Sequence, residues 1–158
     1  MSLDRQPTVI ARTVTRAVVP LILLTAIGLL LQGHNLPGGG FIAGVLTVTA
    51  FALIYIIYGL DYLETELLDR TTTDSEETES NIIREYAEVF ALGLVLAAGS
   101  GIAAILLGYP FLTQAVVFVE PLPIYHELEV ASALVFDIGV YGVVVGALLT
   151  ILAVVGEE

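Results

Sequence analysis

The sequence is first informative for what it lacks. It contains no cysteine, no tryptophan and no lysine, and its only basic side chains apart from two histidines are five arginines. The absence of cysteine excludes disulfides and thiol chemistry. Seventeen acidic residues against five arginines give a net charge of −12, which disfavours nucleic acid and anionic lipid head groups as partners. An acidic chain without lysine would also suit a high-salt cytoplasm.

Signatures of catalysis and of cofactor binding are missing as well. The sequence has no phosphate-binding G-x-x-x-x-G-K-[ST], no zinc-binding H-E-x-x-H, and no serine or cysteine in a nucleophile motif. His126, Glu127 and Glu129 stand close together, but their spacing lacks the thiol or second histidine that makes a metal site specific. We therefore predict a protein that is not an enzyme and that has no cofactor and no metal.

Apolar residues, by contrast, are abundant. Hydrophobic residues make up 57% of the chain and charged residues 14%, and the mean hydropathy is +0.93. Four apolar runs have about the ~20 residues that a helix needs to cross a ~30 Å hydrocarbon layer. They cover residues 13–31, 41–59, 86–107 and 131–155. We predict an all-α, polytopic membrane protein with four transmembrane helices, forming a single domain over residues 1–158.

The connections between these runs differ in character. Residues 60–84 are rich in Asp and Glu and are expected to form a solvated acidic loop. Residues 108–130 are too short and too interrupted by proline to cross the membrane, so we expect a capping or re-entrant segment. No A-x-A cleavage site follows the first run, so it is expected to stay in the mature protein.

The arginines predict how the chain is oriented. All five fall in the N-terminal lead, at the start of the first run, or between the second and third runs: Arg5, Arg12, Arg16, Arg70 and Arg84. Because Lys and Arg accumulate on the cytoplasmic side of membrane proteins, we place both termini and the acidic loop in the cytoplasm.

A glycine-rich stretch, G-H-N-L-P-G-G-G-F, separates the first two runs. Its composition predicts a turn that breaks the helix: Asn35, Pro37, Gly38, Gly39, Gly40 and Phe41. His34 in the same stretch has an unperturbed pKa near ~6.5 and is a candidate for passing protons. We favour its alternative role as a cap on the last carbonyls of the first helix, because the turn is predicted at the outer surface.

Asp137 is the other candidate, because it lies within the fourth apolar run. A carboxylate at the centre of a bilayer costs at least ~2.5 kcal/mol, so it usually faces protein or water and often marks an ion path. Two roles stay open for it: handling an ion, or hydrogen bonding to a partner subunit or to Tyr141. Small residues at helical spacing are expected to let helices approach closely, and these are Gly44, Gly93, Gly101, Gly142 and Gly146.

Two of these stretches carry a family resemblance. Residues 20–44, P-L-I-L-L-T-A-I-G-L-L-L-Q-G-H-N-L-P-G-G-G-F-I-A-G, and residues 129–146, E-V-A-S-A-L-V-F-D-I-G-V-Y-G-V-V-V-G, resemble the MnhB family, the B subunits of the Mrp-type multisubunit Na⁺/H⁺ antiporters. The spacing between the stretches is also similar. Residues 61–85 and 115–123 are not covered by the resemblance.

The resemblance implies a non-catalytic subunit in a complex of six or seven different proteins in the plasma membrane of a prokaryote. Such a complex exchanges cytoplasmic Na⁺ for external H⁺, and the resemblance places the main proton channels in larger partner subunits. Two hypotheses follow for this chain. His34 and Asp137 line or brace a hydrated sodium path at a subunit boundary, or the chain is a purely structural subunit of the antiporter or of a related membrane-bound hydrogenase-like complex. We see no inverted repeat that would favour a self-sufficient transporter.

Overall fold

The computed structural model describes residues 8–32, 38–58, 75–113, 116–119, 128–131 and 133–156. The described elements are α1 (Val9–Gln32), α2 (Gly40–Tyr58), α4 (Ser75–Leu106), β1 (Val116–Val119), β2 (Leu128–Ala131) and α5 (Ala133–Gly156). Each of the four helices contains a stretch that is long and apolar enough to cross a membrane. The prediction of a helical protein with four membrane-crossing helices is confirmed.

The first and third membrane-crossing helices begin earlier than the apolar runs suggested. Thr8 caps α1, because its hydroxyl accepts a hydrogen bond from the Ala11 N–H at 3.2 Å and its carbonyl accepts one from the Arg12 N–H at 3.1 Å. α4 begins at Ser75 instead of near residue 86, so the last part of the predicted acidic loop is helical. Acidic residues follow Ser75 directly, and they favour a helix start through the helix dipole. Residues 59–74 of that loop lie outside the described residues.

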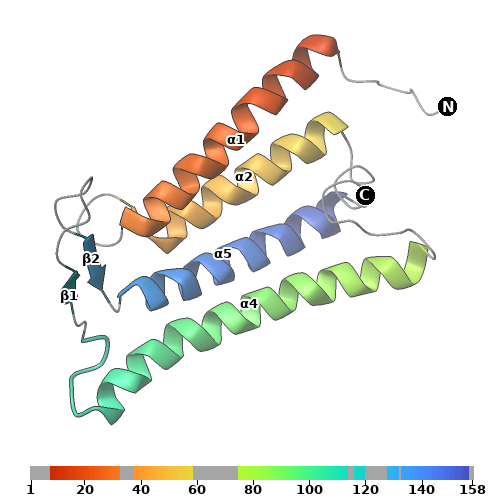
Figure 1. The fold of residues 1–158 in the computed structure, drawn as a ribbon. Coiled ribbons are helices and arrows are strands. Elements are labelled where there is room, and N and C mark those ends of the chain that lie inside the picture. Colours follow the sequence, from red (N-terminus) through yellow and green to blue (C-terminus); the bar gives the residue numbers. More distant parts are fainter. Residues whose placement is uncertain are drawn as a thin grey trace.

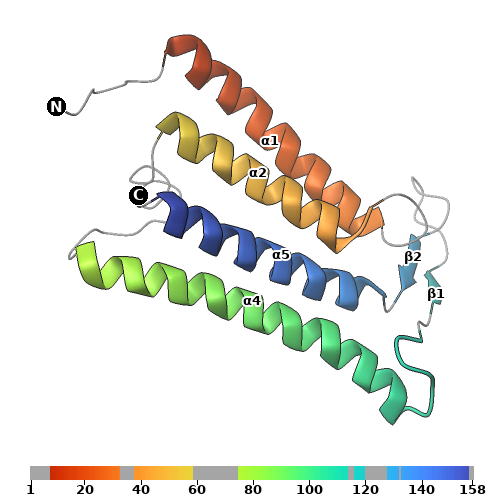
Figure 2. The same cartoon turned by 180° about the vertical axis from the view of Figure 1, so that it is seen from behind.

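The helices lie side by side in the order α1, α2, α5, α4 (Figures 1 and 2). The extensive contacts join α1 to α2, α2 to α5, and α5 to α4. The two central helices, α2 and α5, are therefore far apart in sequence but packed together in space. Of the four membrane-crossing stretches, that of α2 is the most buried, while those of the edge helices α1 and α4 are the least buried.

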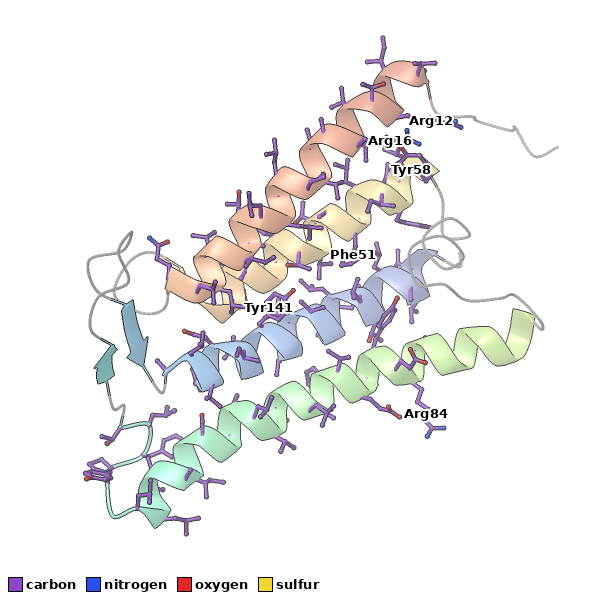
Figure 3. The ribbon with its side chains drawn as sticks, in the orientation of Figure 1. Arg12, Arg16, Phe51, Tyr58, Arg84 and Tyr141 are labelled. Carbon is purple, nitrogen blue, oxygen red and sulfur yellow. The ribbon has the colours of Figure 1, made fainter. Side chains whose placement is uncertain are left out.

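Small and medium-sized side chains fill the interior. The buried hydrophobic residues among those described are alanines, valines and one isoleucine. One cluster of them, Val19 with Ala50 and Ile54, packs between α1 and α2 and is flanked by partly buried side chains that include Phe51 and Tyr58 (Figure 3). Bulky side chains instead cover the outside, where a membrane protein meets lipid or other subunits.

The segment between α4 and α5 contains the two strands, which were not predicted. β1 and β2 pair antiparallel, with Val116 opposite Ala131 and Val119 opposite Leu128. The V-V-F-V sequence of β1 consists of β-branched and aromatic residues that favour strands. The pair lies beyond the helix ends, on the side where α4 ends and α5 begins (Figure 1).

The start of α1 and the end of α5 lie at the same end of the molecule (Figure 1). This agrees with an even number of crossings. Arg12, Arg16 and Arg84 lie toward this end as well (Figure 3). That this end faces the cytoplasm stays a prediction, based on the positive-inside rule.

The natural absence of cysteine makes the orientation directly testable. Single cysteines placed at Ser2, Thr113 and Glu158 should react with a membrane-impermeant maleimide from opposite sides. We expect Ser2→Cys and Glu158→Cys to be labelled only after the cytoplasmic side is opened, and Thr113→Cys to be labelled in intact cells. Labelling of Ser2→Cys and Glu158→Cys from opposite sides would contradict the predicted orientation.

Candidate functional site

Asp137 lies in the second turn of α5 and is almost completely buried, with 3% of its surface exposed. Its Oδ1 accepts a hydrogen bond from the N–H of Gly40, the first residue of α2, at 3.4 Å. The first N–H groups of a helix have no partner within that helix, and they form the positive end of its dipole. The Asp137 carboxylate therefore stabilises the N-terminus of α2 and joins it to α5.

Two of the three consecutive glycines are required for this contact. Gly39 has φ of +100°, its N–H donates to the Leu29 carbonyl at 2.9 Å, and its carbonyl accepts from the Ala43 N–H at 3.2 Å. A Cβ on Gly39 would lie 3.4 Å from Asp137 Oδ1, and one on Gly40 would collide with the α5 backbone at Asp137. A side chain at Gly40 would force α2 and α5 apart, and one at Gly39 would strain the backbone because φ is positive there.

Gly38 and Phe41, the other described residues of this stretch, are less buried than Gly39 and Gly40. Gly38 is half-buried, and the side chain of Phe41 is 63% exposed. His34, Asn35 and Pro37 lie outside the described residues, so their predicted roles stay predictions.

A second polar contact joins α2 and α5 one turn further along. The Tyr141 hydroxyl donates to Thr47 Oγ1 at 3.1 Å, and the Thr47 hydroxyl donates to the Ala43 carbonyl at 2.9 Å. Gly44 lies between the two polar contacts, where a Cβ would be 2.9 Å from the Val144 side chain. Tyr141 thus bonds to Thr47, and this contact differs from the hydrogen bond between Asp137 and Tyr141 that the sequence suggested as one alternative. Thr47 was not singled out from the sequence, because several threonines with similar neighbours occur in the same runs.

Glycines also form the contact between α4 and α5. A Cβ on Gly93 would lie 2.5 Å from the Val143 N and 2.6 Å from the Gly139 O, which means that the two backbones touch. Gly142 lies against Gly93, and a Cβ on Gly146 would lie 2.5 Å from the Phe90 N. Gly139 was missed as a packing residue, although Gly139, Gly142 and Gly146 have the i, i+3, i+7 spacing of one helix face.

Gly101 differs from the other predicted packing residues. The space beside it holds the aromatic ring of Phe111, which belongs to the segment directly after α4. α4 ends at this point in a glycine cap: Gly108 has φ of +83°, its N–H donates to the Ile105 carbonyl, and the Tyr109 N–H donates to the Ala104 carbonyl. This cap turns the chain back so that Phe111, and not another helix, covers Gly101.

The arrangement is suited to joining helices. Within the ranges that the structure describes, the buried polar side chains are Thr15, Thr47 and Asp137, and no group of three or more His, Cys, Asp or Glu residues could hold a metal. Asp137 thus supplies the one buried carboxylate in this part of the chain. These features define a multi-pass membrane protein in which the buried side chains of Asp137 and Thr47 connect α2 to α5.

Comparison with known proteins identifies the family. The chain belongs to the family described as "Domain related to MnhB subunit of Na+/H+ antiporter", which matches residues 10–150. It is 35% identical over 150 residues to the Na(+)/H(+) antiporter B subunit of Alkalihalophilus pseudofirmus, covering 95% of this chain and 93% of that protein. Its identity to the Na(+)/H(+) antiporter B subunit of Bacillus subtilis is 36% over 149 residues, covering 94% and 93% of the two chains.

Two further matches place a similar domain inside longer chains. The chain is 32% identical over 149 residues to the probable K(+)/H(+) antiporter A/B subunit of Rhizobium meliloti, covering 94% of this chain but 13% of that protein. The structure of the Mrp complex from Dietzia sp. DQ12-45-1b contains a chain that matches with a TM-score of 0.68 and 26% identity, over 94% of this chain and 14% of that chain. The resemblance seen in the sequence is confirmed, and the family points to a component of a transporter rather than to an enzyme.

The glycine contact between α4 and α5 can be tested with a matched pair of substitutions on one helix. Gly93→Ala should destabilise the protein by about 1–3 kcal/mol, because the added methyl group meets the α5 backbone. Gly99→Ala is the control, since nothing lies within 4 Å of the added atom. Thermal unfolding of the purified protein measures both effects. Equal melting temperatures for the two variants would show that α4 and α5 do not touch at Gly93.

Proposed function

We propose that this chain is a non-catalytic membrane subunit of a multisubunit cation/proton antiporter of the Mrp type. The observation that carries the proposal is the similarity to the B subunits of two Na(+)/H(+) antiporters, which covers 93% of the length of each. The fold supports it further through the match to a chain of an Mrp complex. The exchange proposed is cytoplasmic Na⁺ for external H⁺, carried out by the whole complex in the cell membrane of a prokaryote.

The proposed partners are the other subunits of such a complex. A domain similar to this whole chain forms a small part of the longer A/B subunit of Rhizobium meliloti. Where the domain is a separate protein, noncovalent contacts must replace that covalent link. The side-by-side arrangement of the helices suits this role, because the edge helices α1 and α4 have little of their surface buried within the chain.

For Asp137, we assign the role of a brace between α5 and α2. A buried carboxylate is costly in a membrane, and the N-terminus of a helix offsets part of this cost by about 0.3–2 kcal/mol. The hydrogen bond from Gly40, the absence of space for a side chain there, and the neighbouring Tyr141–Thr47 hydrogen bond all support a fixed contact. In this role Asp137 maintains the helix arrangement on which assembly with other subunits depends.

The second candidate role is part of a hydrated sodium path. It is favoured by one observation, that Asp137 is an ionisable group buried among apolar helices. A carboxylate in such a place often marks an ion path. The two roles differ in what happens when the charge is removed but the acceptor oxygen is kept.

Replacing Asp137 by Asn or by Ala in the intact complex separates the roles. Asn keeps an oxygen that accepts from the Gly40 N–H, so Asp137→Asn should assemble normally and keep Na⁺/H⁺ exchange per assembled complex within about two-fold, a change worth under about half a kcal/mol. Ala removes the acceptor, at a cost of about 1–3 kcal/mol, so Asp137→Ala should lower the amount of assembled complex. Exchange in everted membrane vesicles, normalised to purified complex, is the measurement.

The contradicting results are distinct. Normal assembly of Asp137→Asn with loss of exchange would assign the residue to the ion path. Absence of cation/proton exchange by the complex that contains the unaltered chain would reject the proposed function itself.

A further inference from the structure

Arg12 and Arg16 lie one helical turn apart in the first two turns of α1, and both side chains are exposed. Neither guanidinium forms an ion pair or donates a hydrogen bond to another residue that the structure describes, whereas Arg84 at the same end pairs with Glu88 at 3.2 Å. Residues at positions i and i+4 of a helix have neighbouring side chains. Among the described residues, the two guanidinium groups thus form a pair of positive charges without an ion-pair partner on one face of α1.

The position of Arg12, the fourth residue of α1, strengthens the attraction of the pair for an anion. Cations near a helix N-terminus face the positive end of the helix dipole, which is unfavourable for them. An anion placed between them would be attracted by both guanidinium groups and by the dipole. The chain as a whole has a net charge of −12, so this local positive charge is opposite in sign to the net charge of the protein.

The neighbouring residues indicate which kind of molecule would carry such an anion. The Tyr58 hydroxyl donates to the Arg12 carbonyl at 3.4 Å, which fixes the end of α2 beside the start of α1, and Figure 3 shows Arg12, Arg16 and Tyr58 close together. On the same turns of α1, Val9 and Val14 are exposed by 80% and 54%. Exposed apolar side chains next to exposed guanidinium groups are suited to binding a lipid, because a lipid has both acyl chains and a phosphate.

We propose that Arg12 and Arg16 together bind the phosphate of an anionic phospholipid in the leaflet at the end of the molecule where α1 begins. No charged residue follows Arg16 in α1, so the pair lies at the edge of the hydrocarbon layer, where lipid phosphates are found. The planar guanidinium group forms bidentate hydrogen bonds with phosphate oxygens, which lysine cannot do. The site is independent of the antiporter function proposed above.

Lipid selectivity of the full chain tests this site. The chain is reconstituted in phosphatidylcholine bilayers with a small amount of spin-labelled phosphatidylglycerol or spin-labelled phosphatidylcholine, and the motionally restricted fraction of each is measured. The unaltered chain should prefer phosphatidylglycerol. Arg12→Gln and Arg16→Gln should each lower that preference about five-fold, as expected for one arginine at an anionic membrane surface. Arg84→Gln, which removes an already paired charge, should leave it unchanged.

A further variant and a competition measurement test the alternative explanations. The double variant Arg12→Lys with Arg16→Lys keeps both positive charges, so it replaces the Gln variants if these fail to fold. It should retain only part of the preference for phosphatidylglycerol. Inorganic phosphate, added at constant ionic strength in place of chloride, should not reduce the preference. The proposal is overturned if the unaltered chain shows no preference, if Arg84→Gln loses as much as the other variants, or if inorganic phosphate abolishes it.

Discussion

The structure depends on the close approach of α5 to two helices at once. On one side, Gly93 of α4 touches the α5 backbone at Gly139 and Val143; on the other, Gly40 of α2 touches it at Asp137. In a membrane, helices gain little from burying apolar surface, because lipid is as apolar as their side chains. Van der Waals contact between backbones and a few hydrogen bonds must hold them together instead. Glycines permit that contact, and Asp137 and Tyr141 form the hydrogen bonds.

This constraint explains why a carboxylate is tolerated inside the bundle. Asp137 lies four residues after the start of α5, or about 6 Å along the helix axis. At this depth it meets the first N–H of α2, a donor with no partner in its own helix. Each group alone would be costly in hydrocarbon, and together they satisfy one another. The break between α1 and α2 thus does more than reverse the chain direction, since it supplies the donor that Asp137 requires.

The sequence predicted the features that depend on composition and periodicity. Four apolar runs of membrane-crossing length identified the helices, and the G-H-N-L-P-G-G-G-F and F-D-I-G-V-Y stretches identified the family. It did not predict which residues meet. The pairing of Asp137 with Gly40 and of Tyr141 with Thr47 depends on the order of helices in space, which a single sequence does not contain. The start of α4 and the β1–β2 pair were missed because an acidic helix start resembles a polar loop, and four-residue strands are too short to show a period.

Because α5 lies between α2 and α4, the helices α1 and α4 occupy opposite edges of the molecule. The most direct test of this order is the distance between spin labels on single cysteines that replace Leu21 of α1 and Val95 of α4, both exposed positions. With helices spaced 8–10 Å apart and two helices between the labels, we predict a separation of roughly 25–30 Å by electron spin resonance. A separation of roughly 10–15 Å, as expected where α1 and α4 are neighbours in a closed four-helix bundle, would contradict this order.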